Sequence, residues 1–265
     1  MPDISVVIPT FRRPRELAEA LASVLAQNVS LDVTVVDDSP EQSARAVVER
    51  LDDARVRYRA MPTPSGGWPS RVRNEGWPST RGRFLHFLDD DDLVPRGHYA
   101  QALAEFEAHP EAGVLFGRVQ PFGDDPRQTV VEAAYFRAAA RRARTCQRLG
   151  QWAFVSRQYF EQTMLVCSAG LIRRECVQAL GGFDPGCRLV EDAVFFARAF
   201  REHGALYVDR VVLHYRVAPS LMRSSPDPAE FVHSYQRAHE SYRTRYGRHE
   251  FLALKAVDRA ALRYL

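Results

Sequence analysis

Four consecutive aspartates, Asp89 to Asp92, follow directly after an apolar run in this chain. The run from Gly82 to Leu88 is short and aromatic-rich and is bounded by Gly82 and Pro95, so it predicts a buried strand. The aspartates then stand at the carboxyl end of that strand, where open α/β sheets place their ligands. Because adjacent negative charges repel one another and are costly to bury, this pattern favours a metal ion and a diphosphate. The alternative is a solvated acidic turn in which Asp92 caps the next helix.

Alternation along an extended backbone pairs two of these aspartates. Asp89 and Asp91 point the same way, so the Asp-x-Asp pair can hold one metal ion. Mg²⁺ takes oxygen ligands from one or two carboxylates and fills its shell with water and substrate phosphates. The run therefore predicts a hard-cation site that is completed by its ligand.

The ends of two other predicted strands carry further binding groups. Pro9 to Arg13 follows the first apolar run, and Asp37-Asp38 follows the second. A ring at Phe11 can stack on a base, Asp38 can accept a hydrogen bond from a base N–H, and arginines can hold a diphosphate. Neither a G-x-G-x-x-G nor a G-x-x-x-x-G-K-[ST] motif occurs, which argues against a dinucleotide dehydrogenase and a P-loop enzyme. The residues favour a nucleotide-diphosphate ligand held without a glycine loop.

A second carboxylate pair, Glu191-Asp192, precedes an apolar-rich helical pattern. Two acids in the first turn of a helix are favoured by the helix dipole alone, so the pair has a purely structural explanation. A positioned carboxylate can also act as a general base on a hydroxyl, which contributes about 10²–10⁴-fold to a rate.

Strands and helices alternate in the pattern that must position these groups. The periodicity predicts βαβ units and a mostly parallel sheet through about residue 110. Later segments are more irregular, with a buried segment over 160–169 interpreted as a strand and a helix ending at Gly181-Gly182. The predicted strands are 3–8, 33–36, 55–59, 82–88, 113–119 and 205–213, and the predicted helices are 14–27, 41–51, 70–79, 96–110, 132–151 and segments of 227–265.

Composition limits the kind of protein. Hydrophobic residues at 46% and charged residues at 26% are ordinary for a globular domain, and the net charge of +3 does not suggest a nucleic-acid partner. The four cysteines show no C-x-x-C spacing, which favours reduced thiols over disulfides or zinc. With no apolar run near 20 residues and no signal-peptide pattern, we expect a cytoplasmic protein, and the inner face of the membrane stays open as a location.

The predicted helix 132–151 is basic and amphipathic, with arginines outside an alanine-rich apolar side. An ordinary solvated surface helix explains this pattern. Contact with an anionic acceptor or with a membrane surface are the functional alternatives.

Successive motifs in the chain resemble those of family-2 glycosyltransferases. They are Val6 to Phe11, Val35 to Ser39, Val72 to Gly76 and Phe87 to Asp92, and the likeness continues through 180–184, 191–192 and 214–216. The resemblance implies an α/β GT-A fold, with a Rossmann-like, mostly parallel sheet flanked by helices. It also implies inverting transfer from a nucleotide-sugar, usually a UDP-sugar, with Mn²⁺ or Mg²⁺.

The resemblance also implies roles for single residues. Asp91 would bind the metal, with Asp89 and His214 as further ligands, and Asp192 would be the base, with Glu191 as alternative or orienting neighbour. Donor contacts would come from Pro9, Thr10, Phe11, Arg13, Asp38, Arg73, Asp89 and Asp90, and acceptor contacts from Gly182, Phe183 and Asp184.

We expect a donor-binding half over 1–110, an acceptor and base half of the same domain over 111–220, and a helical extension over 221–265. Residues 217–225 are expected to form a loop that orders on donor binding. The partners are a nucleotide-sugar donor and an acceptor that the sequence does not identify, and a homodimer and peripheral membrane contact stay open. A sugar-phosphate nucleotidyltransferase or a non-catalytic nucleotide-sugar-binding module are the alternative functions.

Overall fold

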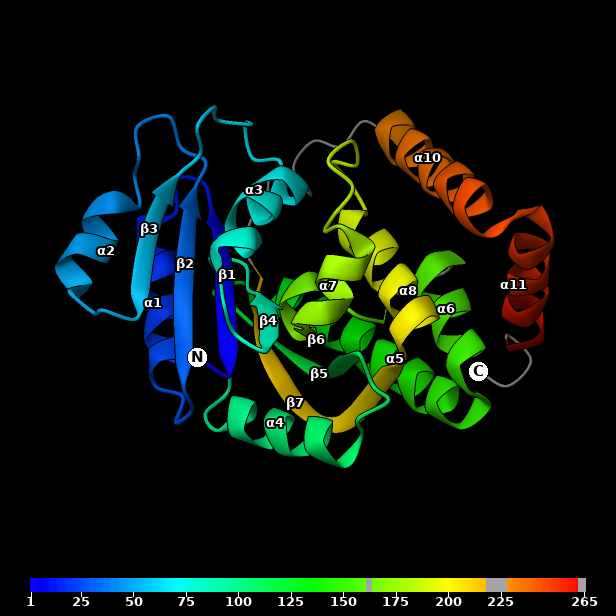
Figure 1. The fold of residues 1–265 in the computed structure, drawn as a ribbon. Helices are drawn as coiled ribbons and strands as arrows, with labels where there is room; N and C mark the ends of the chain where they lie inside the picture. Colours follow the sequence, from blue (N-terminus) through cyan, green and yellow to red (C-terminus); the bar gives the residue numbers. More distant parts are fainter. Residues whose placement is uncertain (161–163, 218–227, 262–265) are drawn as a thin grey trace.

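Seven strands form one mixed sheet in the order β3-β2-β1-β4-β6-β5-β7 (Figure 1). This is a computed structural model, and it describes residues 1–160, 164–217 and 228–261. The α/β architecture with a mostly parallel sheet is confirmed, and both predicted halves contribute strands to the same sheet. The strands are β1 (Ile4–Thr10), β2 (Leu31–Asp37), β3 (Val56–Ala60), β4 (Phe84–Phe87), β5 (Val114–Phe122), β6 (Leu171–Arg173) and β7 (Ala205–Arg216).

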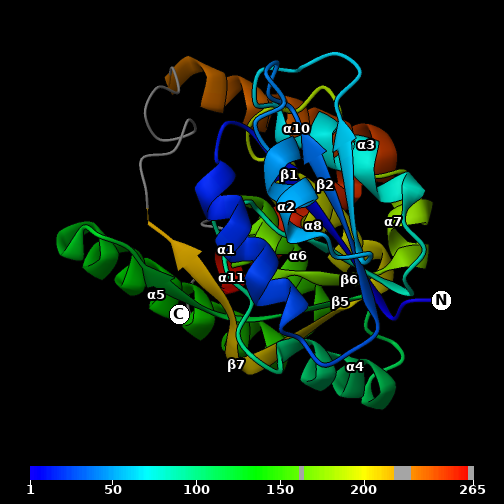
Figure 2. The ribbon, with the colours of Figure 1, turned by 90° about the vertical axis from the view of Figure 1, so that its left-hand side faces the viewer.

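The first four strands run parallel, as the alternating pattern predicted. β1 pairs with both β2 and β4, so the carboxyl ends of all three meet at one edge of the sheet. Helix α1 (Pro14–Leu25) lies on one side of these strands and α3 (Pro69–Gly76) on the other (Figure 2). Helix α2 (Arg45–Leu51) begins later than the predicted Glu41. Residues 38–44 instead form a loop, held by Asp37, whose carboxylate accepts the backbone N–H groups of Ser39 and Ala44 at 2.9 Å each.

The second half adds an antiparallel strand to the sheet. β6 pairs antiparallel with β4 and β5, and β7 pairs parallel with β5. Residues 164–169 are buried as expected, apart from the half-buried Val166, but they form no strand; a 3₁₀ turn spans Cys167–Ala169 after helix α6 (Gln151–Phe160). Helix α5 (Pro126–Leu149) begins earlier than the predicted 132, because Asp125 caps it through the N–H groups of Arg127 and Gln128.

Asp92 is not the cap of the following helix, which corrects that alternative. Helix α4 (His98–Ala108) begins well after the aspartates. The Asp92 carboxylate is 1% exposed and accepts the backbone N–H of Arg216 at 2.9 Å. Asp92 therefore connects the segment Asp89–Asp92, called the aspartate loop below, to the end of β7.

Aromatic rings pack the start of helix α8 (Glu191–His203) against the sheet. Phe183 stacks on Phe195 with ring centroids 4.1 Å apart, and both rings meet Phe87 of β4 edge-on. Phe183 follows helix α7 (Arg174–Leu180), which ends at Gly181 in the left-handed conformation that favours glycine. This packing carries the Glu191-Asp192 pair toward the carboxyl end of β4.

The C-terminal helices α10 (Pro228–Tyr246) and α11 (Arg248–Ala261) pack on the domain. Tyr242, Phe251 and Leu254 are buried, and Arg201 of α8 pairs with Glu250 at 2.8 Å. The predicted donor-ordered loop lies outside the described residues from position 218 onward. Among the helices that the structure describes, none combines the length and the apolar character that crossing a bilayer requires.

Candidate active site

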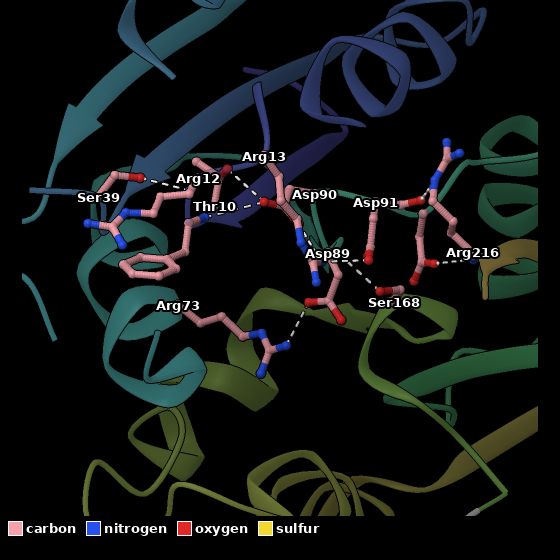
Figure 3. Close-up of polar contacts among 12 residues, drawn as sticks. Thr10, Arg12, Arg13, Ser39, Arg73, Asp89, Asp90, Asp91, Ser168 and Arg216 are labelled. Atoms are coloured by element: carbon pink, nitrogen blue, oxygen red, sulfur yellow. Dashed lines mark hydrogen bonds and ion pairs between the residues drawn. The ribbon is translucent and has the colours of Figure 1, made fainter. Parts of the chain in front are cut away.

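The aspartate loop is held from the neighbouring strand end, as Figure 3 shows. Because β1 and β4 are parallel neighbours, the residues after each strand face one another. Thr10 donates its hydroxyl to Asp90 at 2.7 Å, and the Phe11 N–H donates to the same carboxylate at 3.3 Å. The Arg13 guanidinium lies 2.5 Å from Asp91 and 3.3 Å from Asp90.

Arg73 connects the aspartate loop to the second carboxylate pair. Arg73 lies on α3 and is 2% exposed. One guanidinium nitrogen donates a hydrogen bond to Asp89 at 2.7 Å, and the other terminal nitrogen donates one to Glu191 at 2.8 Å. Its guanidinium also lies over the Phe183 ring, 5.3 Å from the centroid. One buried cation therefore holds carboxylates from two distant segments in one place.

Asp192 is oriented by backbone donors. One carboxylate oxygen accepts the N–H of Cys167 at 3.2 Å, and the other accepts the N–H of Ala193 at 2.7 Å. These bonds fix the carboxylate at the N-terminus of α8 and leave lone pairs on both oxygens.

Burial disfavours the ionised form of the carboxyl groups in this site and so raises their pKa values. The pKa of Asp90 is raised to about 7, mainly by desolvation and then by repulsion from Asp91, whose own pKa burial also raises. The pKa of Glu191 is likewise raised to about 7 by burial and by Asp192, against the lowering effect of Arg73. Burial raises the pKa of Asp192 as well. Strongly perturbed carboxyl groups are typical of functional sites.

A cavity of about 290 Å³ opens between these groups. The aspartate loop and the Glu191-Asp192 pair both line it, so the structure brings the predicted donor, metal and base residues together. Of the predicted residues, the lining includes Pro9, Thr10, Phe11, Arg13, Asp38, Arg73, Asp89, Asp90, Asp91, Glu191 and Asp192.

Asp38 lines the cavity while holding its outer loop. One oxygen accepts the N–H of Ser65 at 2.5 Å, and the other accepts the Ser65 hydroxyl at 2.8 Å and the Gly67 N–H at 2.6 Å. Gly67 has a φ of +81°, which a residue with a side chain adopts at a cost. The segment that contains Gly67 and Pro69 thus forms a wall of the site.

Several predicted site residues do not line the cavity. His214 is absent from the lining while its neighbour Tyr215 is part of it, because successive side chains of a strand point to opposite faces. Phe183 is a core residue with 1% exposure and is not part of the cavity lining, so its acceptor contact stays a prediction. Gly182 is buried, and Asp184 accepts the N–H of Gly186 at 2.8 Å outside the cavity.

Other residues of the site had no local signal in the sequence. Cys167 donates its backbone N–H to the Asp192 carboxylate at 3.2 Å, and the Ser168 hydroxyl accepts the backbone N–H of Asp89 at 3.0 Å. Arg216 donates to the carbonyl of Asp91 at 2.8 Å and to Glu19 at 2.5 Å. These contacts arise only because β6 and β7 are neighbours of β4 and β5 in the folded sheet.

Comparison with known proteins identifies the family of this chain. The model for "Glycosyl transferase family 2" matches residues 5–180. A curated relative, a Campylobacter jejuni GalNAc(5)-diNAcBac-PP-undecaprenol beta-1,3-glucosyltransferase, is 37% identical over 100 residues, which are 37% of this chain and 32% of that protein. The matched stretch is therefore about a third of that relative's length.

Solved structures share the fold. Staphylococcus aureus TarS 1-349 in complex with UDP-GlcNAc superposes with a TM-score of 0.72 at 18% identity, covering 98% of this chain and 71% of that one. A mannosyltransferase from Pyrobaculum calidifontis in complex with GDP-Man and Mn²⁺ gives a TM-score of 0.58 at 18% identity, covering 98% and 75%. From the family model, the cavity and these neighbours, the chain belongs to glycosyl transferase family 2 and has the GT-A fold.

Proposed function

We propose that this chain transfers a sugar from a UDP-sugar to an acceptor hydroxyl with inversion. The observation that carries the proposal is the single cavity lined by both the aspartate loop and the Glu191-Asp192 pair. Single displacement needs a base on one face of the sugar and the leaving diphosphate on the other. Two acidic clusters from separate segments, facing one cavity, suit that requirement.

The nucleoside end of the donor fits the β1 and β2 side of the cavity. Phe11 offers a ring face for the base, Asp38 offers carboxylate lone pairs to base N–H groups, and Arg13 offers a guanidinium to the diphosphate. The structural neighbour with UDP-GlcNAc supports uridine as the nucleoside.

A divalent cation fits the aspartate loop as a partner of the donor. The described part of the chain contains no cluster of three or more His, Cys, Asp or Glu side chains that could hold a metal alone. Mg²⁺ needs only one or two carboxylates when phosphates and water supply the rest, and Asp91 and Asp89 offer oxygen ligands on one loop. When bound, the cation would neutralise the charge that builds on the leaving diphosphate. His214, which lies outside the cavity lining, has no place in this proposal.

Asp192 is the proposed base. Its two backbone hydrogen bonds hold the carboxylate in one orientation, and burial raises its pKa toward the range in which a carboxylate accepts a proton effectively. Glu191 points instead to Arg73 at 2.8 Å. We therefore assign Glu191 the positioning of Arg73 and Asp192 the removal of the acceptor proton.

The test measures donor binding and turnover separately. Isothermal titration with UDP and Mn²⁺, followed by release of UDP from a panel of UDP-sugars, gives the two quantities. Asp91→Asn should weaken UDP binding in Mn²⁺, whereas Asp192→Asn should keep UDP binding and lose about 10²–10⁴-fold in turnover. Full turnover by Asp192→Asn would remove it as the base, and release of pyrophosphate from a nucleoside triphosphate would support the nucleotidyltransferase alternative instead.

A further inference from the structure

One face of helix α5 carries arginines at successive turns and takes no part in the active site. Arg137, Arg141, Arg144 and Arg148 are spaced by four, three and four residues, so they form a single stripe along the helix. All four are exposed, and Glu132 is the only acidic residue of the helix. Val130 continues the stripe toward the N-terminus and is 65% exposed.

A groove runs beside this stripe, between α5 and the end of the sheet. Its volume is about 450 Å³. Arginines form its rim, and its floor is apolar and includes Val119, Ala133, Phe136 and Val211. Helix α5 and the end of β7 extend outward from the body of the molecule (Figure 2). An apolar floor beneath a cationic rim matches a molecule with an anionic head and an apolar tail.

The positive charge of this face is not balanced by the protein. Asp209 is shared between Arg118 at 3.4 Å and Arg144 at 3.1 Å. Within the described residues, the side chains of Arg137 and Arg141 make no hydrogen bond or ion pair. Their guanidinium groups are therefore available to external anions.

The second arginine-rich groove of the molecule shows the contrast. It lies along the edge strand β3, with a volume of about 770 Å³. There Arg55 pairs with Asp53 at 2.7 Å, Arg57 pairs with Asp32 at 2.6 Å, and Arg59 pairs with Glu75. Three arginines of that groove are thus paired with carboxylates, whereas Arg137 and Arg141 of the α5 face are not.

We propose that the α5 face docks the protein on an anionic bilayer surface. Arginines would contact the lipid phosphates, and the exposed Val130 and Val131 at the start of α5 would enter the headgroup region. The face needs no spanning helix, because a basic amphipathic helix binds in the plane of the interface. This inference is independent of the proposed transfer reaction.

Docking there would bring the active site close to the membrane. Phe136, on the floor of the groove, packs edge-on against Tyr215 with centroids 5.2 Å apart. Tyr215 lines the active-site cavity on its other side. A lining residue of the groove therefore packs directly against a lining residue of the active-site cavity.

The test is co-sedimentation with vesicles of phosphatidylcholine alone or with 30% phosphatidylglycerol, in about 0.1 M salt. We expect binding only to the anionic vesicles, weakened by higher salt. Arg137→Gln/Arg141→Gln should lower the partition coefficient about 30-fold, since each arginine near an anionic leaflet contributes about fivefold. Arg50→Gln/Arg96→Gln, at exposed positions on other elements, is the matched control with the same change in net charge and should bind like the wild type.

Three results would overturn the proposal. The first is no binding of the wild type to anionic vesicles. The second is equal weakening by the two double variants, which would mean that total charge alone acts. The third is binding of inorganic polyphosphate that depends on Arg137 and Arg141 without any vesicle binding, which would assign the groove to a soluble anion. Unchanged UDP binding in both variants confirms that they are folded.

Discussion

The Arg73 ion pairs make a quantitative prediction about stability. Arg73 and Glu191 are 2% and 5% exposed, and only one oxygen of Glu191 has a partner among the described residues. Arg73→Met leaves the Glu191 charge buried and uncompensated. Removing one partner of a buried pair costs about 3–5 kcal/mol, so we expect a loss of that size in the free energy of unfolding at pH 8.5.

The pH dependence follows from the raised pKa of Glu191. In the wild type this pKa is about 7, above the ordinary value of 4.5. Between these two pH values the folded state therefore holds a proton on Glu191 that the unfolded state has released. Stability therefore falls as pH rises from about 4.5 to about 7, by about 3 kcal/mol at about 1.36 kcal/mol per pKa unit. Arg73 lowers this pKa, so Arg73→Met raises it further and stability keeps falling above pH 7. The difference between variant and wild type should be small at pH 5 and largest at pH 8.5.

The assay is urea unfolding followed by tryptophan fluorescence at pH 5, 7 and 8.5. Arg73→Met/Glu191→Gln is the matched control, because a neutral side chain at position 191 removes the buried charge. That double variant should recover most of the stability lost at pH 8.5 and show little pH dependence. A loss that is the same at every pH, or under about 1 kcal/mol at pH 8.5, would refute the argument from buried charge.

Three further predictions concern the site. Turnover should fall as pH drops through the raised pKa of Asp192, because the base acts only when unprotonated, and a pH–rate profile reports this. Arg13→Gln should bind Mn²⁺ more tightly in the absence of nucleotide, since Arg13 lies 2.5 Å from the Asp91 oxygen that a cation would contact; unchanged or weaker affinity in calorimetry contradicts this. Phe183→Ala should cost about 3–5 kcal/mol in unfolding free energy, because its ring is part of the core; a loss below about 1 kcal/mol would contradict that role.

The sequence by itself determined the first half of the fold and the donor side of the site. Apolar runs ended by Pro9, Asp37 and Asp89 predict strands, and each binding residue sits within a few positions of a strand end. Parallel neighbours bring such ends together, so local pattern was enough to predict the grouping of Thr10, Asp38 and Asp89 to Asp91. The family motifs added Asp192, which no local pattern separates from a first-turn acid.

Only the tertiary structure decided the contacts between distant segments. Arg73 reaches Glu191 because the rings around Phe183 pack the start of α8 against β4, and such packing has no local signature. Whether His214 or Tyr215 faces the cavity depends on strand register, which a shift of one residue reverses. Phe183 and Asp92 had the residue types of site groups, but their burial assigned them to the core and to the β7 connection. Side-chain direction and burial follow from packing of the whole chain, and neighbouring residues along the sequence do not specify them.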